Sequence, residues 1–150
     1  MEKLSLSVNQ TLKIGKRIAD KLSPGDIILL SGPLGAGKTV LAKGVASGLG
    51  IDKNEVVSPT FVLLRVYQGK HVLQHFDFYR IKAPQDFFGL GYQEYLYSDA
   101  VTLIEWPQRL KLLLPKEFLK IKLFTKAKNQ RLIKFTAKGA RYKKLLKEIN

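Results

Sequence analysis

The feature that most constrains the fold is a short apolar run followed directly by a glycine-rich turn. The run Ile27–Leu30 is bounded by turn residues, which indicates a strand buried on both faces of a sheet. The residues Gly32–Thr39 then match the pattern G-x-x-x-x-G-K-[ST] at every fixed position. Apolar residues at helical spacing follow over about 38–49, and Gly50 ends that helix. The pattern therefore predicts a strand, a glycine turn and a helix in succession.

A turn of this composition is suited to holding phosphate groups. Glycine lets backbone N–H groups point at an anion without a clash of Cβ, and the N-terminus of the following helix adds a positive dipole. The pattern assigns Lys38 to the β- and γ-phosphates and Thr39 to a Mg²⁺ ion. The predicted nucleotide contacts along the turn are Gly32, Pro33, Leu34, Gly35, Ala36, Gly37, Lys38, Thr39 and Val40.

Hydrolysis of a nucleotide needs a metal carboxylate and a positioned water in addition to the phosphate loop. Two strand-like runs end in an acid, at Asp77 and at Glu105, and either acid is a candidate for these tasks. The alternative is that each makes only a structural cap or ion pair. Thr60, after Ser58-Pro59, is a candidate for a switch loop that reaches Mg²⁺, against an ordinary proline turn. Trp106 is the only tryptophan, and from its type alone core packing is favoured over stacking near a nucleotide.

The remaining periodicity predicts the architecture. A first helix covers about 9–22, and a closing amphipathic helix ends near Ile149. Further strands are predicted at 61–67, 71–77, 101–106, 118–124 and 131–137. The first two suit a hairpin, and the last two alternate apolar and basic residues as half-exposed antiparallel strands do. The fold class predicted is α/β: a P-loop NTPase-like sheet, mostly parallel in its centre, with antiparallel strands and helices on both faces. No linker divides the chain, so 1–150 is expected to be a single domain.

Composition narrows the chemistry. Cysteine is absent, which excludes disulfides and thiolate chemistry, and two histidines are too few for a three-histidine zinc site. The net charge is +14, and the segment 111–150 holds 13 basic and 2 acidic side chains. This strongly basic segment suggests either a surface for a polyanion such as nucleic acid or a solvated face, and the second is favoured for charge runs in general. No apolar run approaches the roughly 20 residues that span a bilayer, and no signal peptide is evident, so a cytoplasmic location is expected.

Together these segments resemble the TsaE family, the small P-loop ATPases of bacterial tRNA threonylcarbamoyladenosine synthesis. The resemblance extends from about residue 9 to 115. It rests on Gly32–Thr39, Ser58-Pro59-Thr60-Phe61, His75-Phe76-Asp77-Phe78-Tyr79-Arg80, Leu90–Tyr95, Ile104-Glu105-Trp106-Pro107-Gln108-Arg109 and Leu114-Pro115.

The resemblance implies ATP and Mg²⁺ as ligands, and slow hydrolysis stimulated by partner proteins of the TsaB and TsaD type. Those partners attach a threonylcarbamoyl group to tRNA beside the anticodon. Contact with tRNA is then expected mainly through the complex, and no membrane is involved. Carried over by position, the catalytic residues are Lys38, Thr60, Asp77 and Glu105, and the metal contacts are Thr39 and Glu105, with Glu105 nearer the metal than Asp77. Trp106 and Arg131 are expected near the nucleotide, and Thr11 near the adenine.

Two other functions remain open at this point. A small-molecule kinase could use the same phosphate loop, although the chain shows no arginine-rich lid and has little length for an acceptor pocket. A non-enzymatic RNA-binding module would account for the basic segment 111–150, but it leaves Gly32–Thr39, Asp77 and Glu105 unexplained.

Overall fold

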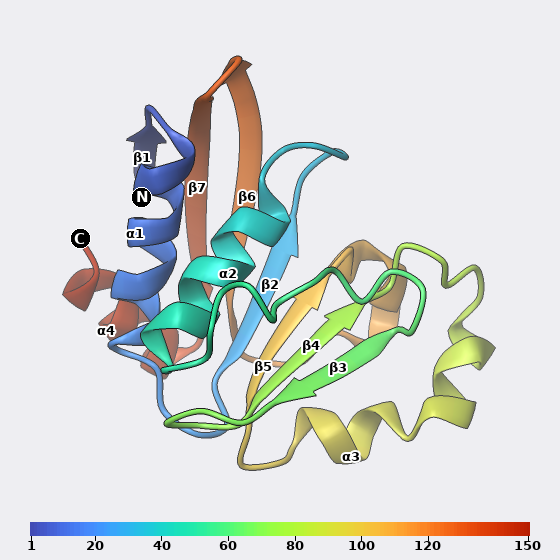
Figure 1. Cartoon of the computed structure of the whole chain (residues 1–150). Helices are drawn as coiled ribbons and strands as arrows, with labels where there is room; N and C mark the ends of the chain where they lie inside the picture. Colours follow the sequence, from blue (N-terminus) through green and yellow to red (C-terminus); the bar gives the residue numbers. More distant parts are fainter.

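The chain forms one seven-stranded mixed sheet with helices on both faces (Figure 1). The computed structural model describes residues 1–150, apart from the side chain of Pro84. The strands lie in the order β1-β7-β6-β2-β5-β4-β3. Their bounds are β1 Glu2–Ser5, β2 Ile27–Ser31, β3 Leu64–Tyr67, β4 Leu73–Asp77, β5 Val101–Glu105, β6 Phe118–Ala127 and β7 Gln130–Lys138.

The centre of the sheet is parallel and its two edges are antiparallel. Strand β2 pairs in parallel with both β5 and β6, and β4 pairs in parallel with β5. The β3–β4 hairpin closes one edge, while at the other edge β7 pairs antiparallel with β6 and β1 pairs antiparallel with β7. This arrangement confirms the fold class predicted from the sequence, the predicted hairpin of β3 and β4, and the antiparallel character predicted for β6 and β7.

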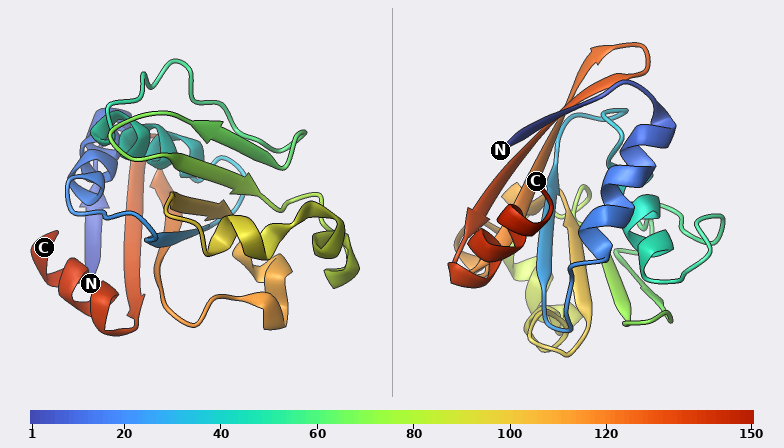
Figure 2. Two further views of the ribbon diagram at one scale, coloured as in Figure 1. Left: turned by 90° about the horizontal axis from the view of Figure 1, so that it is seen from below. Right: turned by 90° about the vertical axis from the view of Figure 1, so that its left-hand side faces the viewer.

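Helices α1 (Val8–Ala19) and α2 (Lys38–Gly48) cover one face of the sheet, and α4 (Ala140–Glu148) packs into the same apolar core below them (Figure 2). The other face is covered by α3 (Tyr92–Leu96) and two 3₁₀ segments, Pro84–Leu90 and Pro107–Leu113. Successive residues of the buried strand β2 point alternately into the apolar cores on the two faces of the sheet, which is why Ile27–Leu30 are all apolar. Among the described residues, no helix has both the length and the apolarity that crossing a bilayer requires.

A glycine contact sets the position of α2, and with it the start of the phosphate loop's helix. A Cβ atom at Gly15 of α1 would lie 2.5 Å from the carbonyl oxygen of Leu41, and one at Gly44 of α2 would lie 2.4 Å from that of Leu12. Only glycine at both positions lets the two helix backbones approach this closely. The first turn of α1 is fixed separately, because Gln10 N–H donates to the hydroxyl of the N-cap residue Ser7 at 3.1 Å.

Several boundaries differ from the sequence-based expectations. Strand β3 begins at Leu64 rather than at 61, because the chain turns at Leu63, whose φ is 68° and whose N–H donates to the carbonyl of Pro59. Strand β5 ends at Glu105 because Trp106 adopts a left-handed conformation. Helix α1 ends at Ala19, short of residue 22. The edge strand β1, helix α3 and the 3₁₀ segments were not predicted, since each is short and lacks a clear period.

Candidate nucleotide-binding site

The glycine turn between β2 and α2 has the backbone conformation of a phosphate-binding loop. Gly32, Gly35 and Gly37 have φ of 142°, 75° and 101°, in the region that disfavours residues with a Cβ. At Gly32 a Cβ would also meet the carbonyl oxygen of Leu123 on β6 at 2.6 Å. The turn is therefore packed directly against the neighbouring strand, and glycine at position 32 is required on both counts.

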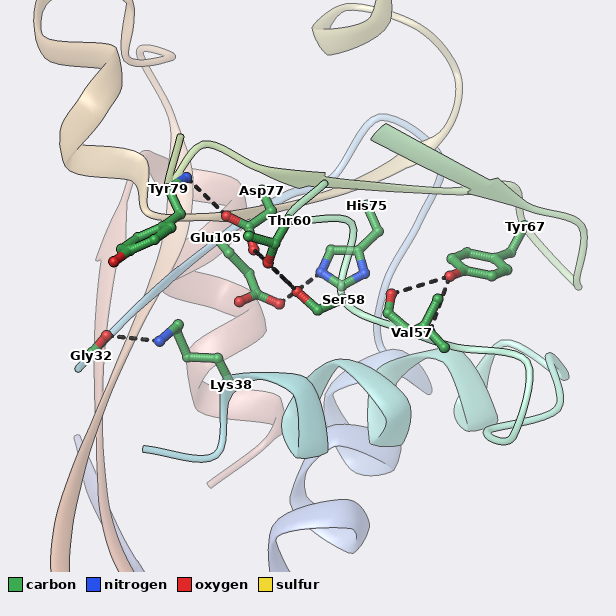
Figure 3. Close-up of polar contacts among 10 residues, drawn as sticks. All are labelled: Gly32, Lys38, Val57, Ser58, Thr60, Tyr67, His75, Asp77, Tyr79 and Glu105. Atoms are coloured by element: carbon green, nitrogen blue, oxygen red, sulfur yellow. Dashed lines mark hydrogen bonds and ion pairs between the residues drawn. The ribbon is translucent and has the colours of Figure 1, made fainter. Parts of the chain in front are cut away.

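Lys38, the first residue of α2, points its ammonium group back into the loop (Figure 3). Its Nζ donates to the carbonyl oxygens of Gly32 at 2.8 Å and Pro33 at 3.0 Å, and lies 4.7 Å from the centre of the Trp106 ring. Burial lowers the pKa of Lys38, and the nearby carboxylates of Glu105 and Asp77 oppose that shift. An anion bound beside the Lys38 ammonium would stabilise this desolvated positive charge, so the position is suited to an anionic ligand.

The two candidate acids lie side by side at the carboxyl ends of parallel strands. Asp77 ends β4 and Glu105 ends β5, and the two residues are direct partners in the strand register. Both are almost fully buried, with 1% and 2% of their surface exposed. Ligands bind at the carboxyl ends of the parallel strands in open α/β sheets. The glycine turn follows the carboxyl end of β2, so it lies at the same end of the sheet as the two acids.

Asp77 holds the segment that contains Thr60. Its Oδ2 accepts hydrogen bonds from the hydroxyls of Thr60 at 2.7 Å and Ser58 at 3.1 Å, and its Oδ1 accepts from the backbone N–H of Tyr79 at 2.8 Å (Figure 3). The two hydroxyls are themselves 2.7 Å apart. All of these donors face one carboxylate, so Asp77 fastens the predicted switch segment to the end of β4.

Glu105 has a different partner. Its Oε1 lies 2.9 Å from Nε2 of His75, a fully buried side chain on the same strand as Asp77. Nδ1 of His75 has no hydrogen-bond partner among the described residues, so Nε2 is the nitrogen that engages the acid. The contact fixes the orientation of the Glu105 side chain, and it uses only one of the two carboxylate oxygens.

Arg131 reaches the loop from β7, which lies two strands away from β2 in the sheet. Its Nε donates to the carbonyl of Ala36 at 2.8 Å, and its Nη2 donates to that of Gly35 at 3.3 Å. The remaining nitrogen, Nη1, donates to three carbonyls around the turn between β6 and β7, those of Ala127, Lys128 and Gln130. The guanidinium thus ties the glycine turn to the tip of the β6–β7 hairpin.

These groups surround a cavity of about 340 Å³, a size within the usual range for ligand pockets. Its lining residues are Leu34, Gly35, Gly37, Lys38, Thr39, Val40, Ser58, Thr60, Asp77, Tyr79, Glu105, Trp106 and Arg131. Sequence reasoning did not list Ser58 and Tyr79 as site residues, nor His75 as the partner of Glu105. All three belong to the quoted Ser-Pro-Thr and His-x-Asp-x-Tyr segments, which was the available signal.

Four of the predicted contacts lie outside this lining: Thr11, Gly32, Pro33 and Ala36. The carbonyl groups of Gly32 and Pro33 accept hydrogen bonds from Lys38, and that of Ala36 accepts one from Arg131. Thr11 is buried, and its hydroxyl pairs with that of Ser5 at 2.8 Å. A contact between Thr11 and a nucleotide stays a prediction.

The donor set fits a magnesium ion bound together with a nucleotide. The Thr39 hydroxyl and the Glu105 carboxylate line the same cavity, with Asp77 beside them. Hard oxygen donors, few in number and supplemented by substrate phosphates, are what Mg²⁺ takes in such sites. Glu105 retains a carboxylate oxygen beyond the one that contacts His75, whereas both oxygens of Asp77 already accept hydrogen bonds.

A parallel-centred sheet, a glycine turn between its inner strand and a helix, and two acids at neighbouring strand ends define the P-loop NTPase-like class of α/β folds. Comparison with known proteins gives the family. The model of the family "Threonylcarbamoyl adenosine biosynthesis protein TsaE" matches residues 5–133, and the chain belongs to this family.

Relatives support the assignment over most of the chain. A tRNA threonylcarbamoyladenosine biosynthesis protein TsaE from Treponema pallidum is 42% identical over 82% of this chain and 90% of its own length. Its counterpart from Bacillus subtilis is 39% identical over 97% of this chain and 91% of its own length. The crystal structure of YdiB from Bacillus subtilis superposes with a TM-score of 0.84 at 35% identity, covering 99% of this chain and 93% of that one.

Proposed function

We propose that the protein binds ATP with Mg²⁺ in the cavity around Lys38, hydrolyses it slowly, and so supports a complex that forms threonylcarbamoyladenosine in tRNA beside the anticodon. The biosynthetic role follows from membership of the TsaE family. The partners proposed are the transfer proteins of the TsaB and TsaD type. The TsaE-type protein supplies the nucleotide cycle and does not itself transfer the threonylcarbamoyl group.

The observation that carries the ATPase part is the convergence of three charged groups from separate elements on one cavity. Lys38 comes from the glycine turn, Asp77 from β4 and Glu105 from β5. A strand-to-helix glycine turn has a structural use in many folds, but burying two acids at adjacent strand ends facing its lysine is costly, and structural hydrogen bonds alone do not require both of them. The arrangement suits a triphosphate and its metal, whose charges the three groups would balance.

The chain's own residues have distinct tasks in this proposal. Lys38 and the N–H groups of the turn bind the β- and γ-phosphates, and Arg131 holds the turn in shape by its bonds to Gly35 and Ala36. Thr39 and Glu105 would hold Mg²⁺, which when bound neutralises phosphate charge. Asp77 keeps Thr60 at the cavity wall. Among the described residues lining the cavity, Arg131 is the only arginine and its donors are engaged by carbonyls, so a slow rate without partners is expected.

Binding can be followed by the fluorescence of Trp106, the only tryptophan, because the Lys38 ammonium lies over its ring. We expect MgATP to change this emission and to saturate it. Lys38→Ala should abolish the change, whereas Lys43→Ala, the same substitution further along α2 and outside the cavity lining, should leave it intact. If Lys38→Ala bound MgATP as well as the unmodified protein, the nucleotide site would be wrongly placed.

The role in tRNA modification is tested by reconstitution with TsaB-type and TsaD-type proteins and unmodified tRNA. Threonylcarbamoyladenosine is measured by mass spectrometry over repeated turnovers. We expect ATP hydrolysis by the protein to rise in the complete mixture, and multiple turnover to require Lys38. Sustained turnover with the Lys38→Ala protein would show that its ATP cycle does not support the reaction.

A further inference from the structure

Over residues 118–124 of β6 and 132–138 of β7, side chains alternate between the core and the opposite face. Leu119, Ile121 and Leu123 of β6 and Ile133 and Phe135 of β7 enter the core beneath α1 and α2. The intervening residues project from the opposite face of the hairpin. They are Phe118, Lys120, Lys122 and Phe124 of β6 and Leu132, Lys134, Thr136 and Lys138 of β7.

This outer face is open and basic. All four lysines and Thr136 are exposed, and α3 and the 3₁₀ segments cover the same side of the sheet only as far as Phe118. The only acid among the described residues of this face is Glu2 of β1, which pairs with Lys134 at 2.7 Å. We call the surface formed by Lys120, Lys122, Lys134, Thr136 and Lys138 the basic face.

The register brings lysines of the basic face next to one another, and only Lys134 among them has the acid Glu2 as a partner. Lys122 lies directly opposite Lys134, and Lys120 is two residues from Lys122 on the same strand, roughly 6.6 Å away. Like charges directly opposite one another destabilise a sheet. A polyanion bound across the strands would turn this repulsion into attraction.

The aromatic residues indicate which polyanion fits. The ammonium of Lys122 lies 4.9 Å from the ring centre of Phe124, and that of Lys138 lies 5.7 Å from the ring centre of Phe118. These rings are half-buried and occupied by lysines, so they order the ammonium groups instead of presenting a surface on which bases could stack. Such a face is suited to contacts with backbone phosphates rather than with bases, as proteins make on helical RNA stems.

We propose that the basic face binds the phosphate backbone of an RNA stem. This proposal rests on the tRNA role in the proposed function. It is independent of ATP hydrolysis, because the basic face lies outside the nucleotide cavity. The protein would then hold RNA through its own β6–β7 hairpin, in addition to any contact made by partner proteins.

The test compares two variants of equal charge. One is the triple substitution Lys120→Gln, Lys122→Gln and Lys138→Gln on the basic face. The control is Lys143→Gln, Lys144→Gln and Lys147→Gln on α4, where the three side chains are also exposed. Both variants fall by three charges from +14. Affinity for a fluorescently labelled, unmodified tRNA transcript is measured by anisotropy across a salt series, with MgATP binding followed by Trp106 fluorescence on the same samples.

We expect the basic-face variant to weaken tRNA binding on the order of 100-fold at about 0.1 M salt. The slope of log K against log salt should fall by about 2 to 3, as for the loss of three phosphate contacts, while the α4 control keeps the original slope within about 1. MgATP binding should be unchanged in both. A failure of the unmodified protein to bind MgATP would overturn the ATPase proposal and leave this one standing.

Three outcomes would overturn the proposal itself. The first is no binding of tRNA by the unmodified protein. The second is equal weakening by both variants, which would reduce the interaction to diffuse charge. The third is displacement of tRNA by polyglutamate at the same concentration of charges as RNA, which would favour an acidic protein surface as the occupant of the basic face.

Discussion

The hydrogen bond from Thr60 to Asp77 allows a quantitative test of how the switch segment is held. The Thr60 hydroxyl lies 2.7 Å from Oδ2 of a carboxylate that is 1% exposed. Hydrogen bonds to charged groups contribute about 1.5–3 kcal/mol, and the nearby Ser58 hydroxyl at 3.1 Å would compensate part of a loss. Thr60→Val keeps the shape of the side chain and removes the donor. We therefore expect it to lower the free energy of unfolding by about 1–2 kcal/mol.

Urea unfolding followed by circular dichroism measures this change, which should appear as a lower midpoint with an unchanged m-value. In a thermal scan it corresponds to a fall in Tm of about 2–8 °C for a chain of this size. Thr125→Val, at an exposed threonine of β6, is the matched control and should stay within about 0.5 kcal/mol of the unmodified protein.

A double-mutant cycle separates this contact from general effects. Asp77→Asn keeps an oxygen that can accept the hydrogen bond from the Tyr79 N–H. It removes the negative charge of the carboxylate to which the Thr60 hydroxyl donates. The coupling energy between the two substitutions should be about 1 kcal/mol or more, because their side chains are in direct contact. Additive effects, agreeing within about 0.5 kcal/mol, would refute the view that Asp77 fastens the segment through Thr60.

Three further outcomes are expected. Gly44→Ala should lower the free energy of unfolding in urea by at least about 2 kcal/mol, because its Cβ would meet the Leu12 carbonyl oxygen at 2.4 Å. A loss below about 0.5 kcal/mol, the size expected for a surface substitution, would contradict the close contact between the helices. Lys38→Met should be more stable than the unmodified protein at neutral pH, because the lowered pKa of Lys38 means that folding disfavours its ammonium. That difference should disappear as the pH rises through the folded pKa toward 10.5, the ordinary value; a difference that stays constant with pH would argue against it. Arg131→Gln should weaken MgATP binding about tenfold in the Trp106 titration by releasing the carbonyls of Gly35 and Ala36, and unaltered affinity would show that the turn keeps its shape unaided.

The phosphate loop and its flanking elements were predictable because everything they need is contiguous. A buried strand, three glycines at positive φ and a helix starting at Lys38 follow from residues that are neighbours in the chain. The alternation along β6 and β7 likewise predicted two half-exposed antiparallel strands, because a period of two is visible in any single strand. Conversely, β1 carries no such signal, and it exists because β7 offers an edge to which it can pair.

The sequence by itself determined that a glycine turn, a lysine and several acids of the right type were present. Only the tertiary structure decided which of these groups meet. Asp77 and Glu105 look equivalent as strand-end acids, and they acquire different partners because the register of β4 and β5 puts one against Thr60 and the other against His75. Arg131 reaches the turn across 95 residues of chain because β7 lies beside β6. Local patterns report the short-range preferences of the backbone, whereas contacts between distant residues depend on how whole elements pack, which no single segment encodes.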